Sequence, residues 1–209
     1  MKKFLLLNHP LIQDKMAILR NRETGREEFR RLVEEITIFM GYEVTKGLSL
    51  ADAKVKTPLG EAAVKVLSEK KPFIVAILRA GDGMVPGMLK IIPTLKVGHL
   101  GIYRNERSLD PVEYYNKLPD DCATRDCILL DPMLATGGSA SHALNLIKAK
   151  GVKNIKFMCL VACRDGVYKI NYDHPDVQIF AAALDNTLLK NGYIYPGLGD
   201  AGDRLYGTK

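Results

Sequence analysis

Residues 127–139 read CILLDPMLATGGS, and this stretch decides the fold that the sequence predicts. Its first four residues are apolar and predict a buried strand that ends at the carboxylate of Asp131. The Thr-Gly-Gly-Ser run at 136–139 then opens an expected helix from Ser139 to Lys150. Ligands of a parallel sheet bind beyond the carboxyl ends of its strands, and the N–H groups at a helix start bind anions. The stretch therefore predicts a phosphate site with a carboxylate beside it.

The carboxylate distinguishes this stretch from other phosphate-binding loops. Asp131 could hold the hydroxyls of a ribose, and Thr136 and Ser139 add hydroxyl donors for a phosphate. A Walker loop would end in Gly-Lys-Ser or Gly-Lys-Thr, and the sequence contains neither. Residues 81–87 (GDGMVPG) are similar to the glycine pattern of a dinucleotide loop, but Pro86 stands where the third glycine belongs and no acidic residue ends the next expected strand. The predicted ligand is therefore a sugar phosphate.

The second half of the chain alternates expected strands and helices. Strands that are covered on both faces are apolar throughout, and four further runs fit this pattern: Phe73–Leu78, Val97–Tyr103, Ile155–Val161 and Val177–Ala183. Helices are expected between several of them, at Met84–Ile92 and Gly166–Tyr172. This alternation predicts an α/β fold with a parallel sheet and right-handed crossovers.

The first half of the chain predicts two helices. Thr24–Glu27 has the pattern of a capping box, and a helix should follow to about Glu43. Thr57-Pro58 is a second start signal, because proline suits the first helical position. The apolar residues after it fit one face of a helix that ends before Pro72: Leu59, Ala62, Ala63, Val66 and Leu67.

Two more glycine-rich segments carry residues suited to ligand binding. Residues 77–83 (ILRAGDG) place Arg79 directly after a strand, where its guanidinium could hold an anion, although a strand-end salt bridge is the alternative. Residues 192–204 (GYIYPGLGDAGDR) combine four glycines with aromatic and charged residues. Such a loop could present backbone N–H and C=O groups to a small planar ligand, or it could be a structural wrap.

One long connection, Arg104–Pro119, shows neither a helical nor a strand period. Loops of more than about 12–15 residues are commonly lids or binding loops. We expect a lid, because Arg104 and Arg107 stand at its start. The alternatives are a flexible insertion or a hairpin that makes a dimer contact.

Composition excludes several classes of protein. The chain has 209 residues, a length typical of one domain. Its net charge is +6, but the 30 basic residues are spread along the chain, so we expect no nucleic-acid partner. No apolar run approaches the ~20 residues of a membrane span, and the apolar run at residues 4–7 is too short for a signal peptide, so we expect a cytoplasmic protein without a membrane partner.

The cysteines give no zinc pattern. Cys127, Cys159 and Cys163 lie in or beside apolar runs, where free cysteine behaves as a small hydrophobic residue, and Cys122 stands apart. His9, His99, His142 and His174 are isolated in the sequence and are expected to be structural.

Three segments closely resemble the uracil phosphoribosyltransferases: ILRAG at 77–81, DPMLATGGSA at 131–140 and YPGLGDAGDR at 195–204. The resemblance extends to residues 98–104, 111–119 and the terminal YGTK, in the order of the family and over nearly the whole chain. Phosphoribosyltransferases of other branches usually have two adjacent acids at the end of the strand. Pro132 in the second position is similar to the uracil branch.

This resemblance implies a fold and a reaction. The implied fold is a type I phosphoribosyltransferase core, a parallel sheet flanked by helices, within one domain of residues 1–209. A lid would span about 104–119, and a small hood that binds the base would span about 185–209. The implied reaction joins uracil to the phosphoribosyl group of phosphoribosyl pyrophosphate (PRPP), with Mg²⁺ as cofactor, and yields UMP and pyrophosphate.

The resemblance also implies roles for individual residues. Arg79, Arg104, Asp131 and Asp200 would be catalytic. The PRPP-binding set would be Arg79, Arg104, Asp131, Pro132, Met133, Leu134, Ala135, Thr136, Gly137, Gly138, Ser139 and Asp200. The uracil-binding set would be Ile194, Gly199, Asp200 and Ala201. No side chain would bind the metal directly, since Mg²⁺ would arrive on the pyrophosphate and meet Asp200 through water.

Further expectations follow from the family. They are a homodimer or larger homo-oligomer, GTP as an effector, and a cis peptide bond near the ILRAG turn. Tyr195, Lys46 and the Cys163–Gly166 turn depart from the usual pattern of the family. The rival functions are a transferase for another base, an RNA-binding pyrimidine regulator on the same core, and a plain nucleotide-binding module.

Overall fold

The computed structural model describes residues 3–68, 70–104 and 111–208, without the side chains of Arg104 and Pro111. Within these residues the centre is an eight-stranded sheet in the order β1-β10-β9-β7-β4-β5-β6, with β8 paired to β9. All neighbours are parallel except β5 and β6. The strands are β1 (Phe4–Leu6), β4 (Phe73–Leu78), β5 (Lys96–Arg104), β6 (Pro111–Lys117), β7 (Cys127–Leu130), β8 (Met133–Leu134), β9 (Ile155–Cys163) and β10 (Gln178–Asp185).

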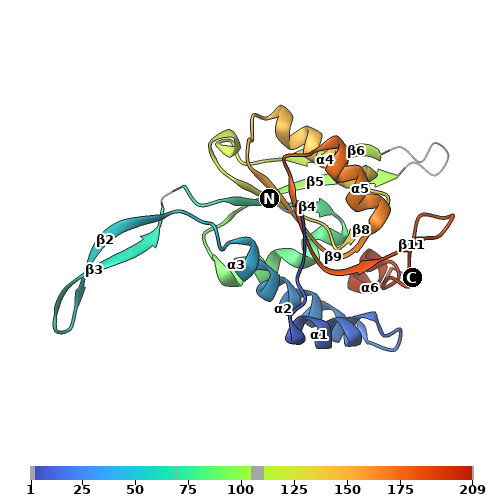
Figure 1. Ribbon diagram of the computed structural model, residues 1–209, viewed down its shortest axis with the longest axis horizontal. Coiled ribbons are helices and arrows are strands. Elements are labelled where there is room, and N and C mark those ends of the chain that lie inside the picture. Colours follow the sequence, from blue (N-terminus) through green and yellow to red (C-terminus); the bar gives the residue numbers. More distant parts are fainter. Residues whose placement is uncertain (1–2, 69, 105–110, 209) are drawn as a thin grey trace.

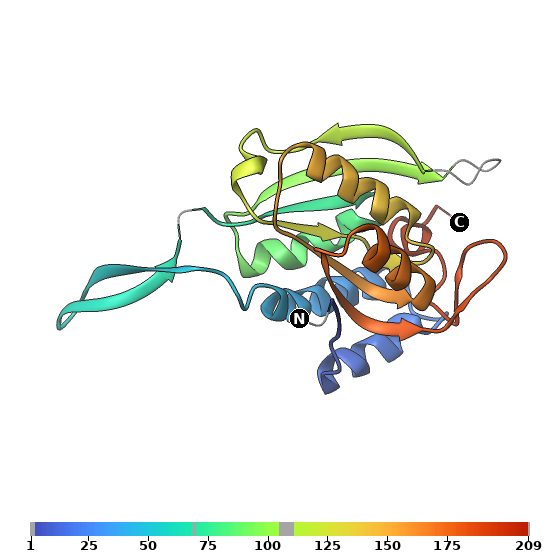
Figure 2. The same ribbon diagram turned by 45° about the horizontal axis from the view of Figure 1, so that its top comes forward.

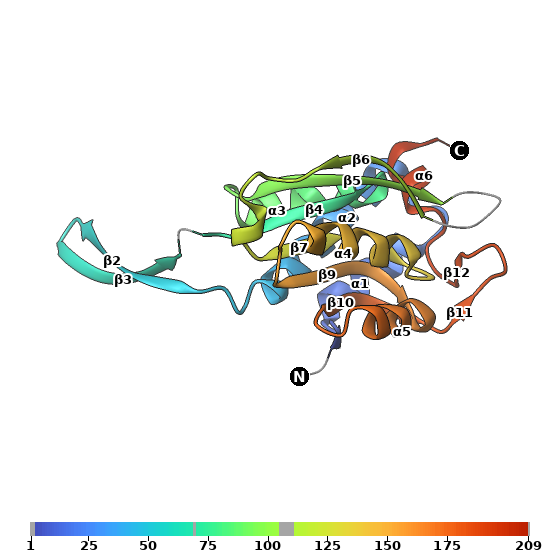
Figure 3. The ribbon, with the colours of Figure 1, turned by 90° about the horizontal axis from the view of Figure 1, so that it is seen from above.

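Helices cover both faces of the sheet (Figure 3). One face carries α1 (Pro10–Arg20), α2 (Arg26–Val44), α3 (Val85–Ile91) and α6 (Ala201–Tyr206); the other carries α4 (Gly138–Ala149) and α5 (Arg164–Asp173). Alternate residues of β4 enter different cores: Ile74 packs with α1–α3, whereas Val75 packs with α4 and α5. Burial on both faces explains why the strands are apolar throughout. The predicted α/β fold with a largely parallel sheet is confirmed.

The order of the strands creates a switch point between β4 and β7. From β4 the chain crosses through α3 to β5 on one side, and from β7 it crosses through α4 to β9 on the other. The two connections therefore leave the carboxyl ends of these neighbouring strands in opposite directions. A crevice for ligands forms at such a point.

The predicted second helix is wrong. Residues 50–67 form a hairpin of β2 (Leu50–Thr57) and β3 (Gly60–Leu67), which projects from the body (Figure 1; Figure 2). Thr57 Oγ1 accepts hydrogen bonds from the N–H groups of Leu59 and Gly60, at 3.3 and 3.2 Å, and so closes the turn. Ala62, Val64 and Val66 alternate along one face of β3, and this period of two governs the segment.

The ends of other elements also differ from expectation. The predicted capping box fails, because Gly25 is the N-cap of α2 and Thr24 Oγ1 instead donates to Ile18 O. The helix itself ends at Val44, one residue beyond the expected Glu43. A helix was expected to start at Met84. The structure has a 3-10 turn at Ala80–Met84, and α3 follows directly after it. Strand β1 was not predicted, and it adds a parallel edge strand through β10.

The connection Arg104–Pro119 is not wholly irregular. Strand β6 occupies Pro111–Lys117 and pairs antiparallel with β5, so the prediction of a loop without strand structure is wrong for this half. A hairpin was the alternative, and the described part of the segment takes that form. Residues 105–110, where a lid was expected, lie outside the described residues.

All four cysteines are buried and free. In the part of the chain that the structure covers, no helix is long and apolar enough to cross a membrane.

Candidate active site

A cavity of about 360 Å³ lies at the switch point, where the three glycine-rich segments meet. Ala80 belongs to the turn after β4, and Asp131, Met133 and Ala135 belong to the loop after β7. The opposite wall is C-terminal and consists of Asn191, Gly192, Tyr193, Ile194, Gly199, Asp200, Ala201 and Gly202. Residues far apart in the sequence therefore approach each other here. Arg79 and Asp203, for example, are 124 positions apart.

Asp131 stands at the end of β7, where its carboxylate is partly withdrawn from water. Its Oδ1 accepts a hydrogen bond from the N–H of Met133 at 3.3 Å. Burial raises the pKa of Asp131 to about 7, and the Met133 N–H only partly offsets this effect. The group therefore ionises near neutral pH, and in its ionised form it accepts hydrogen bonds from hydroxyl groups of a ligand.

The loop after Asp131 is fixed to the sheet and leads into α4. Pro132 O accepts the N–H groups of Leu160 and Val161, both at 3.0 Å. Gly137 has φ +83°, a conformation that favours glycine, and it is the N-cap of α4. Gly137 has no side chain to cap the first turn, and the contact there from the Gly138 N–H to Thr136 Oγ1 is a long one, at 3.4 Å, so the N–H groups of that turn can bind an anion. The geometry fits the predicted phosphate site.

Arg79 lies at the end of β4, at the edge of the cavity. The predicted cis peptide bond is present, between Leu78 and Arg79. The Arg79 side chain is 55% exposed and its Nη2 lies 3.4 Å from Oδ1 of Asp203. An exposed ion pair of this length contributes little, about 0–1 kcal/mol. An anionic ligand with better hydrogen-bond geometry could therefore replace Asp203 as the partner of the Arg79 guanidinium.

The C-terminal wall carries an acid whose two oxygens are both engaged. Asp200 caps α6, because its Oδ1 accepts the N–H of Asp203 at 2.9 Å. The Tyr193 hydroxyl donates to Oδ2 of Asp200 at 3.2 Å. The charge of Asp200 raises the pKa of Tyr193, which keeps the phenol protonated as a donor. Tyr193 was missed in the sequence, where it is one of several aromatic residues and no local motif marks it.

The four residues expected at uracil all line the cavity: Ile194, Gly199, Asp200 and Ala201. Ile194 and Ala201 are buried, and Gly199 has φ +81°. Ile194 belongs to the short strand β12 (Ile194–Tyr195), which pairs with β11 (Thr187–Leu188). Tyr195 is 60% exposed and is not part of the lining.

The remaining candidates are placed less completely. Arg104 ends β5, the parallel neighbour of β4, so its backbone lies at the same edge of the sheet as Arg79. Its side chain lies outside the described residues. The histidines are absent from the lining of the cavity; His174, for example, is buried between α4 and α5, with its Nε2 3.0 Å from Ser141 Oγ.

Comparison with solved structures gives the class of protein. The chain matches a hypoxanthine phosphoribosyltransferase from Trypanosoma cruzi with a TM-score of 0.51 and 11% identity, over 79% of this chain and 77% of that chain. A hypoxanthine-guanine phosphoribosyltransferase from Bacillus anthracis gives a TM-score of 0.51 at 7% identity, over 77% and 80%. At these identities the likeness shows the fold, which is that of the type I phosphoribosyltransferases.

Closer matches give the family. A solved protein structure from Aquifex aeolicus matches with a TM-score of 0.93 and 38% identity, over 99% of both chains. The family model for uracil phosphoribosyltransferase matches residues 6–208. Uracil phosphoribosyltransferases from Clostridium kluyveri and Lactobacillus delbrueckii subsp. bulgaricus are 55% and 56% identical over the full length of both chains. This chain belongs to the uracil phosphoribosyltransferase family.

Proposed function

We propose that this chain is a pentosyltransferase that transfers the 5-phosphoribosyl group of PRPP to N1 of uracil, giving UMP and pyrophosphate. Membership of the family supports the reaction. The observation that carries it to this chain is the cavity in which the loop of Asp131 faces the backbone of Ile194–Ala201. One wall suits a ribose phosphate and the other suits a small base.

The donor half of the site rests on charge and backbone donors. Ionised Asp131 accepts hydrogen bonds from the ribose hydroxyls, while Thr136–Ser139 and the first turn of α4 hold the 5′-phosphate. Arg79 and Arg104 bind the pyrophosphate, whose negative charge increases as its bond to ribose C1 breaks. These groups stabilise the leaving pyrophosphate by charge and hydrogen bonds, and the proton of uracil N1 is released to solvent as the N1–C1 bond forms.

The acceptor half of the site recognises the base through hydrogen bonds from the backbone. Ile194, Gly199 and Ala201 form hydrogen bonds to uracil through their N–H and C=O groups, beside Asp200. A carbonyl that accepts from uracil N3–H would face the unprotonated N3 of cytosine and lose its partner, so cytosine is disfavoured. Alignment of uracil N1 against ribose C1 supplies much of the catalysis, an effect that can reach roughly 7–11 kcal/mol.

Magnesium fits this arrangement as a companion of the pyrophosphate. Among the side chains that the structure describes, no three His, Cys, Asp or Glu residues cluster into a metal cage. Mg²⁺ commonly binds through one or two carboxylates, water and substrate phosphates, and Asp200 is exposed and reaches the cavity. When bound, Mg²⁺ would neutralise charge on the leaving pyrophosphate. Asp200 would orient it through water.

A panel of bases tests this function against a transferase for another base. Pyrophosphate release from PRPP and Mg²⁺ is measured with uracil, cytosine, adenine, hypoxanthine or guanine as acceptor. We expect release with uracil and at least about a hundredfold less with the others, because mismatched buried polar groups are costly. Faster release with a purine would overturn the assignment of uracil.

We further propose that two copies of the chain assemble through the β2–β3 hairpin. Three successive cross-strand pairs on one face join Ala to Val: Ala51 with Val66, Ala53 with Val64 and Val55 with Ala62. The other face carries ion pairs, such as Lys54–Glu61 at 3.2 Å. A hairpin alone is at best marginally stable in water, and this one projects from the body (Figure 1), with Val55 and Val66 each 42% exposed.

The same chain offers an apolar counter-surface. A groove of about 630 Å³ runs along β1, α1 and α2, and Leu6 and Tyr42 in it are 42% and 71% exposed. In a two-fold dimer each copy can supply both surfaces, so both apolar areas would be covered at once. The occupant that fits is therefore a second copy of this chain.

GTP as an effector stays a prediction of the family resemblance, and UMP formation with and without GTP tests it.

A further inference from the structure

An ion pair behind the cavity joins two elements that the reaction does not use directly. Arg20 ends α1 and Asp185 ends β10. Arg20 Nη1 and Nη2 donate to the two carboxylate oxygens of Asp185, each at 2.8 Å. The Asp185 side chain is only 9% exposed. A bidentate pair withdrawn from water in this way is rigid in its geometry.

Both members of the pair also hold the same backbone residue, Gly197. The Gly197 N–H donates to Asp185 Oδ2 at 2.9 Å, and Gly197 O accepts from Arg20 Nη1 at 2.8 Å. Gly197 has φ +59°, and a Cβ there would collide with Ile194 O, so the turn is tight and admits glycine only. Gly197 lies between the proposed uracil contacts Ile194 and Gly199. The pair therefore fixes the loop from which those contacts come.

A second arginine holds the next residue to the same end of α1. Arg204 Nη1 donates to Leu198 O at 3.0 Å and to Leu19 O at 2.8 Å. Its Nη2 donates to Asn21 O at 2.7 Å, and its guanidinium lies 4.3 Å from the centre of the Phe29 ring. Residues 197 and 198 are thus tied to α1 by two independent guanidinium groups.

We propose that the Arg20–Asp185 ion pair is a positioning clamp for the uracil-binding backbone of residues 194–201. The proposal rests on the proposed function, and it assigns Arg20 and Asp185 a role in acceptor binding although neither lines the cavity. The carboxylate orients an N–H of the loop and the guanidinium orients the adjacent C=O. Backbone readout of a base needs both groups fixed, since a shift of about 1 Å can cost as much as a hundredfold in rate.

The clamp predicts a kinetic signature that a merely structural ion pair would not give. Asp185→Asn keeps the shape but loses the charge, and Arg20→Met removes both donors to Gly197 and Asp185. We expect kcat/KM for uracil to fall by about tenfold to a hundredfold while KM for PRPP stays within about twofold. The donor loop after β7 has its own supports on β9, so it should be unaffected.

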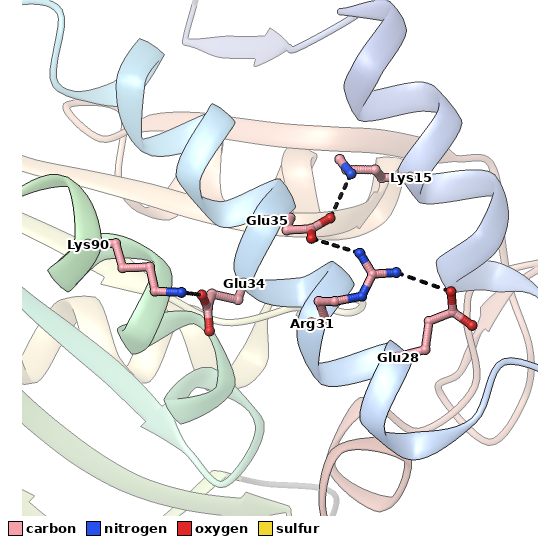
Figure 4. Close-up of polar contacts among 6 residues, drawn as sticks. All are labelled: Lys15, Glu28, Arg31, Glu34, Glu35 and Lys90. Atoms are coloured by element: carbon pink, nitrogen blue, oxygen red, sulfur yellow. Dashed lines mark hydrogen bonds and ion pairs between the residues drawn. The ribbon is translucent and has the colours of Figure 1, made fainter.

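The matched control is another ion pair of the same helix. Lys15 of α1 pairs with Glu35 of α2 at 2.6 Å (Figure 4), so Lys15→Met removes a cation from α1 without touching the Gly197 turn. We expect the kinetics of this variant to match the wild type. Equal losses for uracil and PRPP in the clamp variants, or unchanged uracil kinetics in a folded Asp185→Asn protein, would overturn the proposal.

Hydrogen exchange separates this proposal from the proposed function. Amide exchange in residues 194–200 should be faster in Arg20→Met and Asp185→Asn than in the wild type or Lys15→Met, whether or not UMP forms. Failure of the wild type to form UMP would reject the function alone. Unchanged exchange in this segment would reject the clamp alone. Should Arg20→Met fail to fold, Asp185→Asn, which preserves the side-chain volume, provides both measurements.

Discussion

At Asp131, the environment of the carboxyl group opposes the ionised form that the ligand needs. Burial raises its pKa to about 7. A neutral carboxyl would be a poorer acceptor for ribose hydroxyls than the carboxylate. The protein therefore holds a group that ionises fully only at the upper end of the neutral range, at the position where PRPP would bind.

Replacing Asp131 by Asn isolates this charge. We expect UMP formation to fall by at least about a hundredfold, because the strong charge-assisted hydrogen bonds to the ribose are lost. The fold should persist, since the amide can still accept from the Met133 N–H. Steady-state kinetics together with a thermal melt check both points. Activity close to wild type would remove Asp131 from the proposed ribose contact.

The raised pKa also predicts how stability and binding depend on pH. In the unfolded chain an Asp has a pKa of about 3.9, so the fold favours the protonated form of Asp131. Its contribution to the free energy of unfolding is full below about pH 4 and is lost as the pH rises through about 7. Asp131→Asn should therefore gain stability relative to the wild type between pH 4 and pH 8. Parallel stability curves for the two proteins would contradict the raised pKa.

The pH dependence of PRPP binding has the opposite sign to that of stability, because PRPP needs the ionised form of Asp131. KM for PRPP should fall as the pH rises from about 6 to about 8 in the wild type. The Asn variant provides the correction for the titration of PRPP itself. If the two proteins share one pH profile, Asp131 is not the group that titrates.

Among the elements, the contact between α2 and α3 shows which interactions join two neighbouring helices on one face of the sheet. Lys90 of α3 pairs with Glu34 of α2, and Arg31 bridges Glu28 and Glu35 along α2 (Figure 4). These pairs are at the surface and each contributes about 0–1 kcal/mol. Close packing beneath them is more sensitive: a Cβ on Gly87 would lie 2.6 Å from Glu34 O and 2.8 Å from Thr37 Cβ.

Gly87→Ala should therefore destabilise the protein far more than loss of the ion pair above it. We expect about 1–3 kcal/mol from overpacking against backbone, and less than about 1 kcal/mol for Lys90→Met. Gly47→Ala is the control, because no atom lies within 4 Å of the added methyl group. Chemical denaturation of the three variants gives the comparison. A larger loss in Lys90→Met than in Gly87→Ala would show that charge, not packing, joins the helices.

The elements also show what could be predicted from the sequence. The strand, turn and helix around Asp131 were predicted because the signals lie within thirteen residues, 127–139. The β2–β3 hairpin was missed because Ala62 and Val66 fit a helical period together with Leu59, and they also alternate with Val64 along a strand. Burial could not decide between the two, since the hairpin packs against no core within one chain.

At the scale of the whole molecule, the structure shows contacts between residues far apart in the sequence, which no local sequence pattern predicts. Arg20 and Asp185 are 165 positions apart, and Arg79 and Asp203 are 124 apart. No local motif links the two members of either pair; they meet because α1 packs against β10 and α6 packs against the turn after β4. The candidate residues of the cavity were predicted through family resemblance, whereas the residues that hold its acceptor loop required the three-dimensional structure.

Assembly is a property of the whole molecule, and the apolar face of the β2–β3 hairpin predicts that copies of the chain associate. Size-exclusion chromatography with light scattering should give twice the 23.2 kDa mass of one chain, or a multiple of that. Val64→Lys, on the apolar face, should give monomers because a buried lysine would be unpaired. Lys54→Ser, on the charged face, should keep the wild-type mass. A monomeric wild type, or assembly that survives Val64→Lys, would contradict the proposed interface.

The central claim is that one cavity joins a phosphoribosyl donor on the β7 loop to uracil on the C-terminal loop. The direct test follows labelled uracil and PRPP together in the presence of Mg²⁺. The account predicts that UMP and pyrophosphate form in equal amounts and at the same rate, and that both rates fall by at least about a hundredfold in Asp131→Asn. Pyrophosphate without UMP would mean that water, not uracil, is the acceptor, and no product of either kind would contradict the account as a whole.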